Sequence, residues 1–75
     1  MLSFDITQEG RAIQICCDEK GMAILIRALE RLRADGGHVH LLTPGSGAYR
    51  GLELSAKDPW GRDTIPEVII DWVQD

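Results

Sequence analysis

One strongly amphipathic segment constrains the fold of this chain more than any other feature. It lies between Asp18, which can cap a helix, and Gly36-Gly37, which can end one in the left-handed conformation. On a helical wheel its large apolar residues fall within one stripe of about 120°. The stripe consists of Met22, Leu25, Ile26, Leu29 and Leu32. The segment therefore predicts one helix that packs through this stripe against the rest of the chain.

Ile24 is the exception to this pattern. Together with Ala28 it lies off the stripe, on the side of Arg27 and Arg31. Two interpretations stay open at this point: Ile24 is a singly exposed aliphatic residue, or it belongs to a contact surface.

The segments on both sides of the helix alternate between apolar and polar residues, as half-buried strands do. Residues 2–7 and 12–17 predict two strands of a hairpin whose turn contains Gly10. Residues 38–42 predict a third strand, which Pro44 ends. A fourth short strand is expected at 52–54, joined to the third by a hairpin over 44–51. Residues 65–73 predict a last strand, with Val68, Ile70 and Trp72 on one face and Trp72 in the core.

The predicted order is strand, strand, helix, strand, strand, strand. This order is typical of an α+β fold with two layers, in which one amphipathic helix packs on a mainly antiparallel sheet of about five strands. Residues 56–64 are too short a loop to separate two domains, so residues 1–75 form a single domain. Strand order does not follow from the sequence.

The size and charge of the chain narrow the range of partners. A chain of 75 residues buries only about 60 to 65% of its unfolded surface, so its core must be efficient or helped by self-association, as in a homodimer. Its longest apolar run, residues 22–26, is far shorter than a membrane span, and no basic leader precedes an apolar run at the N-terminus. We therefore expect a cytoplasmic protein with no membrane partner.

The net charge of −4 argues against a nucleic-acid partner and favours a basic protein. The sequence also offers no recognisable catalytic motif. Cys16 and Cys17 are adjacent, so a bridge between them would be strained, and we expect free thiols. Neither they nor Ser46 and Ser55 belong to a known nucleophile motif. We expect no catalytic residues, no cofactor and no enzymatic activity.

His38 and His40 are two residues apart on a predicted strand and therefore share a face. Such a pair can bind zinc, and Asp5 with Gln14 or Cys16 could lie on the same face. A polar outer sheet face and direct contact with a partner are the other interpretations. Because the ligand set is incomplete, we expect no bound metal.

Three stretches of the chain together have a recognisable pattern. They are Ile26-Arg27-Ala28-Leu29-Glu30-Arg31-Leu32, then Gly37-His38-Val39-His40-Leu41-Leu42-Thr43-Pro44, then Gly51-Leu52-Glu53-Leu54-Ser55. In this order they resemble the immunity protein 32 family of bacterial polymorphic toxin systems. The resemblance covers nearly the whole chain. It implies a small cytoplasmic α+β protein that binds and neutralises a cognate toxin. After Thr-Pro the family usually has a tryptophan and paired glycines, whereas this chain has Gly45-Ser46-Gly47-Ala48-Tyr49.

The sequence therefore predicts a binding surface on the loop at 44–50 and the outward-facing strand residues, with Trp60 in the next loop as a further candidate. The candidate partner-binding residues are His38, His40, Tyr49, Arg50, Glu53 and Trp60. Two alternative functions stay open: a structural or regulatory protein-binding module that dimerises and is unrelated to toxins, and a metal-dependent enzyme that uses the two histidines.

Overall fold

The computed structural model describes residues 1–47 and 52–73, and contains one helix and two antiparallel strand pairs. The elements in chain order are β1 (Leu2–Thr7), the 3₁₀ turn η1 (Gln8–Gly10), β2 (Ala12–Cys17), α1 (Glu19–Asp35), β3 (His38–Leu42), the 3₁₀ turn η2 (Pro44–Ser46) and β4 (Glu67–Asp71). β1 pairs with β2, and β3 pairs with β4. The predicted α+β class is confirmed, but the strands are four in two separate sheets and not about five in one.

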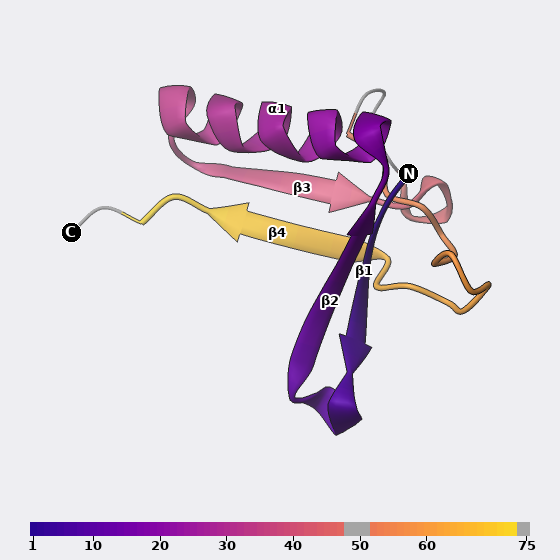
Figure 1. Ribbon diagram of the computed structural model, residues 1–75. Coiled ribbons are helices and arrows are strands. Elements are labelled where there is room, and N and C mark those ends of the chain that lie inside the picture. Colours follow the sequence, from indigo (N-terminus) through magenta and orange to yellow (C-terminus); the bar gives the residue numbers. More distant parts are fainter. Residues whose placement is uncertain (48–51, 74–75) are drawn as a thin grey trace.

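Figure 1 shows how these parts are arranged. Helix α1 runs along the β3–β4 pair, while the β1–β2 hairpin lies across one end of that pair and projects away from it. The hairpin has the predicted strands, with Leu2 opposite Cys17 and Thr7 opposite Ala12. Gly10 adopts a φ of 86° in the turn, as expected from its position. Within the described residues, no helix is long and apolar enough to cross a membrane.

The ends of α1 confirm the predicted cap and stop. The Asp18 side chain accepts a hydrogen bond from the backbone N–H of Gly21 at 2.8 Å. It also accepts one from the N-terminal ammonium of Met1, and these two bonds lower the pKa of the Asp18 carboxyl. At the other end Gly36 takes a positive φ of 68°, which favours glycine.

The segment at 52–54 differs from its prediction. Glu53 forms an isolated parallel bridge with Leu42, so this segment does not return along β3 as the antiparallel arm of a hairpin. The backbone N–H of Leu54 donates to Leu42 at 2.8 Å, and that of Ser55 donates to Leu2 at 2.7 Å. The segment thereby links the β3–β4 pair to the β1–β2 hairpin. The segment follows this path because Leu54 is thereby almost fully buried between the two strand pairs.

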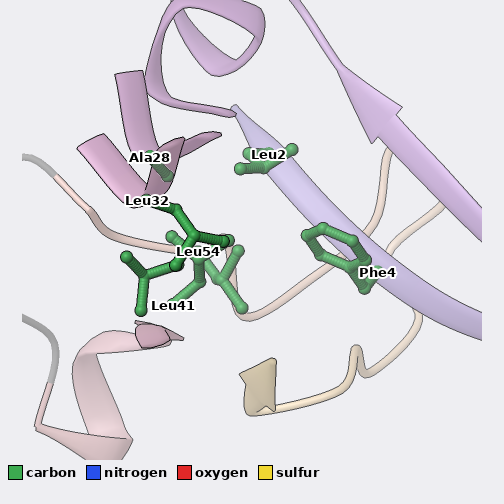
Figure 2. Close-up of a cluster of buried hydrophobic side chains, with 7 residues drawn as sticks. Leu2, Phe4, Ala28, Leu32, Leu41 and Leu54 are labelled. Atoms are coloured by element: carbon green, nitrogen blue, oxygen red, sulfur yellow. The ribbon is translucent and has the colours of Figure 1, made fainter. Parts of the chain in front are cut away.

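A compact cluster of apolar side chains from α1, β1, β3 and the 52–54 segment forms the core. Its buried members are Leu2, Phe4, Ala28, Leu32, Val39, Leu41 and Leu54. Figure 2 shows Ala28 and Leu32 of the helix close to Leu2, Leu41 and Leu54. The core therefore lies where the helix meets both strand pairs.

The helix uses a different face from the one expected. Of the predicted stripe, Leu32 is buried and Leu25 packs against the core, but Met22, Ile26 and Leu29 are 46%, 47% and 45% exposed. The inward face is centred on Ala28 and Leu32, so the prediction is wrong for the other three residues. The large apolar residues of α1 together with Ala28 span about 200° of the wheel, which is wider than one packed face. The small Ala28 side chain allows a close approach to the core, and this decides which part of the arc turns inward.

Two further expectations are corrected by the same packing. Ile24 is partly buried against the core and is not an exposed contact residue. Trp72, expected in the core, is 46% exposed beside the C-terminal half of the helix.

The face of the hairpin that carries the polar residues of β1 is less exposed than these residues suggest. Ser3 and Asp5 are buried, because the chain at 55–65 runs beside β1 and the Ile65 N–H donates to Phe4 at 2.8 Å. Within the described residues, Ser3 Oγ and Asp5 Oδ2 have no hydrogen-bond partner. Asp5 consequently does not lie with the histidines of β3 on one open face.

Candidate functional site: the open sheet face

The face of the β3–β4 pair turned away from α1 gathers several of the predicted residues. Val39 and Leu41 are buried toward the helix, so the alternate positions of β3 point the other way. The register places each of these opposite a β4 residue on the same face. Glu53 joins them because it is bridged to Leu42. We call this surface the open sheet face; it consists of His38, His40, Glu53, Glu67, Ile69 and Asp71, with the half-buried Leu42 between Glu53 and Glu67.

The two histidines form an ordered pair on this face. Their ring centroids lie 4.9 Å apart in an edge-to-face arrangement. His40 Nδ1 lies 2.9 Å from Glu67 Oε2, and both side chains are partly exposed. This contact orients the His40 ring while its other nitrogen is left for another partner.

The charge of the open sheet face is acidic. Two carboxylates, from Glu67 and Asp71, flank Ile69 along β4, and Ile69 is 51% exposed. A third, from Glu53, lies on the far side of β3 beside Leu42. Neither β3 nor β4 contains a lysine or arginine. Arg31 of the helix borders the face, where it lines a shallow pocket of about 290 Å³ with both histidines. The surface thus combines an exposed apolar side chain with carboxylates on the same face, which suits a basic protein surface.

A metal site at the histidines has no geometric support. In residues 1–47 and 52–73, no group of three or more His, Cys, Asp or Glu side chains is placed to hold a metal ion. Asp5, considered above as a further ligand, is buried in the hairpin. The expected absence of metal stays a prediction that elemental analysis can check.

Trp60 is presented by a separate, tightly bonded turn. Asp58 Oδ1 accepts hydrogen bonds from the backbone N–H groups of Trp60 and Arg62, each at 2.9 Å. Its Oδ2 accepts a third from Arg62 Nε at 2.7 Å. The Arg62 guanidinium carbon lies 5.2 Å from the centroid of the Trp60 ring, while the indole is 65% exposed.

The structure does not bring this turn to the histidines. The chain around Trp60 lies beyond the C-terminal end of β3, whereas His38 begins that strand at its other end (Figure 1). Tyr49 and Arg50 lie outside the described residues. Of the predicted set, His38, His40 and Glu53 therefore come together, and Trp60 is apart from them.

The bonded turn predicts a stability difference that depends on pH. Burial alone would raise the pKa of Asp58, but the hydrogen bonds and charge of Arg62, with the Trp60 N–H, outweigh it and lower the pKa. A lowered folded-state pKa means that ionised Asp58 stabilises the fold at neutral pH. This stabilisation is lost as pH falls through the folded pKa.

We therefore expect Asp58→Asn to lower the melting temperature at pH 7 and to differ less from the parent in strong acid. Asp63→Asn is the matched control, because Asp63 is 88% exposed and pairs only with Lys57 in the described structure. This variant should have nearly the same melting temperature as the parent protein. Equal effects of both variants would show that the Asp58 bonds do not hold the turn.

The sequence pattern placed Met22, Ile26 and Leu29 in the buried stripe of the helix, so it did not identify them as surface residues. A signal was present, because Ile24, Ala28, Met22 and Ile26 together make the apolar arc too wide for one contact.

The chain matches no family model, no curated protein and no solved structure. The resemblance to the immunity protein 32 family therefore depends on the motif residues alone. In the fold these residues have structural roles, since Val39, Leu41 and Thr43 are all buried and the Thr43 N–H donates to Pro66 at 3.0 Å.

Proposed function

We propose that this protein is an immunity protein that binds a cognate bacterial toxin and blocks it by occlusion. The observation that carries the proposal is the open sheet face, where the exposed Ile69 lies between Glu67 and Asp71 and a third carboxylate, Glu53, lies across β3. The motif resemblance indicates that the partner is a toxin, and the acidic residues of the face indicate that the toxin surface is basic. A basic toxin surface would bury Ile69 and pair its cations with the carboxylates at the rim.

The charge of the chain supports this mode of action. A net charge of −4 speeds the encounter with a cationic partner, and this long-range attraction weakens as salt is added. Short-range contacts around Ile69 would then determine how slowly the complex dissociates.

The surroundings of His38 and His40 are better explained by contact with a partner protein than by catalysis. His40 is hydrogen-bonded to a carboxylate, and no Ser, Thr or Cys of the described residues bonds to either ring. A nucleophile activated by a histidine would need such a contact. In the complex the rings can instead donate to, or accept from, groups of the partner.

The test uses the toxin encoded beside this gene and measures its affinity for variants of the open sheet face. Asp71→Lys and Ile69→Lys should each weaken binding by about tenfold or more, because both place a cation against a basic surface. Glu9→Lys is the matched control for Asp71→Lys, because it makes the same change in net charge at the exposed hairpin turn; its change is larger than that of Ile69→Lys. It should retain most of the affinity and show only the general loss of electrostatic attraction.

Parent-like affinity for both face variants, with folding intact by circular dichroism, would contradict the proposed surface. Tyr49→Ala and Trp60→Ala would then show whether either loop carries the contact. If no toxin is encoded nearby and the protein does not protect cells, the alternative function is favoured, namely a structural or regulatory protein-binding module.

A further inference from the structure

A row of exposed side chains follows one side of α1, away from the face that packs on the core. The positions alternate at intervals of three and four residues and lie within about 80° of the helical wheel. We call this row the helix stripe; it consists of Glu19, Met22, Ile26, Leu29 and Arg33. Its three central members are each nearly half exposed.

Trp72 widens the helix stripe at its C-terminal end. A groove of about 400 Å³ lies between Trp72 and the helix, and its helix wall includes Ile26, Leu29 and Arg33. The Trp72 N–H donates to Gly37 at 2.8 Å, which fixes the backbone that carries the indole. The groove is therefore a formed feature, with apolar walls that are open to solvent.

The exposed area of the chain is large for its size. The accessible surface is 5479 Å². A folded monomer of this mass is expected to expose about 4,600 Å², so the chain exposes about a fifth more. A standard protein–protein interface buries about 800 Å² on each partner, which is close to this excess. Part of this excess belongs to the projecting β1–β2 hairpin, where Ile6, Ile13 and Ile15 are exposed, and part to the helix stripe and Trp72.

We propose that the helix stripe and Trp72 form the interface of a symmetric homodimer, with the two α1 helices packed antiparallel. The occupant is a second copy because the stripe is complementary to itself. Glu19 and Arg33 lie seven residues before and after Ile26. A two-fold axis through Ile26 places Glu19 of each copy beside Arg33 of the other.

The spacing and charge of the stripe fit this partner better than a basic protein. Intervals of three and four residues form the seam along which two helices pack. The stripe has one acidic and one basic end and an apolar centre, so it offers no net attraction to a cation. A basic partner is drawn instead to the carboxylates of the open sheet face.

This dimer does not depend on the proposed function. The open sheet face is turned away from α1, so its residues remain accessible when two helices pack together. A dimer could therefore offer two copies of that face. Self-association and binding to a toxin should respond to different substitutions.

Sedimentation velocity over a range of concentrations tests the interface. The parent protein should sediment as a dimer and dissociate on dilution. Ile26→Glu should raise the dissociation constant by about a hundredfold or more, because two like charges would meet at the symmetry axis. Ile13→Glu is the matched control, since Ile13 is an even more exposed isoleucine on the hairpin. It should leave the dimer intact.

A charge exchange tests the antiparallel arrangement. Glu19→Lys and Arg33→Glu should each weaken the dimer by about three- to tenfold, because each change creates two repulsive pairs across the axis. The double variant should recover most of the loss, since lysine then faces glutamate. Circular dichroism of each variant verifies that the helix is intact.

Three results would overturn the proposal. The first is a parent protein that stays monomeric up to about 1 mM. The second is a dimer that survives Ile26→Glu or is lost with Ile13→Glu. The third is a double charge variant as weak as the two single changes combined, which would exclude the antiparallel pairing.

Discussion

Replacing Leu41 by alanine is expected to lower the free energy of unfolding by about 2 to 5 kcal/mol. Leu41 is completely buried in the middle of β3, where it lies between α1 and the 52–54 segment. A chain of 75 residues has a total stability of only about 4 to 11 kcal/mol. The variant should therefore be partly unfolded at 37 °C, as urea or thermal unfolding followed by circular dichroism can show.

Leu29→Ala makes the same chemical change at a site that is nearly half exposed. It should cost about 1 kcal/mol or less when measured in an Ile26→Glu background, where dimer formation does not contribute. This pair of variants distinguishes the observed helix orientation from the one predicted by the wheel, in which Leu29 is central. Equal losses at both sites would favour the predicted orientation.

The features predicted correctly from sequence depend on interactions between near neighbours. The hairpin from Leu2 to Cys17 follows from alternation on both sides of a turn that contains glycine. The helix cap at Asp18 and the positive φ at Gly36 follow from single side chains at the helix ends. The bounds of β3 follow from the alternation that ends before Pro44.

The errors concern contacts between distant parts of the chain. The helix has more apolar surface than one face can bury, so its rotation depends on which neighbours fit most closely. Ala28 is buried because it is small, although a hydropathy pattern gives weight to larger residues. The parallel bridge of Glu53 to Leu42 likewise depends on the burial of Leu54, which no local pattern indicates.

In the candidate site, too, the local features were predicted from sequence and the long-range contacts were not. Period-two alternation correctly placed His38 and His40 on one face, and Glu53 joins them. The residues contributed by β4, which are Glu67, Ile69 and Asp71, were not predicted as site residues. They come to the open sheet face by pairing with β3 residues that are 25 to 33 positions away in the chain, and the sequence does not specify the register of this pairing.

Gly21 provides a prediction that opposes ordinary helix propensity. It lies in the first turn and a half of α1, where alanine would normally stabilise a helix by about 1 kcal/mol relative to glycine. A Cβ atom added here would lie 1.6 Å from the carbonyl oxygen of Met1 and 3.1 Å from Cys17 Cβ. Neither distance can be relieved by rotating a flexible side chain.

The obstructing carbonyl is held in place by its own hydrogen bond. Met1 O accepts from the Asp18 N–H at 3.1 Å, so moving it away breaks the bond that joins the start of β1 to the start of the helix. We expect Gly21→Ala to lower the free energy of unfolding by about 1 to 3 kcal/mol, as overpacking of a close contact does.

Ala23→Gly is the control, because Ala23 is exposed two residues further along the same helix. It should lose about 1 kcal/mol through propensity alone, with no steric contribution. Chemical denaturation of the parent, Gly21→Ala and Ala23→Gly proteins measures the three free energies of unfolding, and circular dichroism verifies the helix content. A Gly21→Ala protein more stable than the parent would show that the chain start does not pack against the helix, and that Leu2 is held in the core by its strand pairing alone.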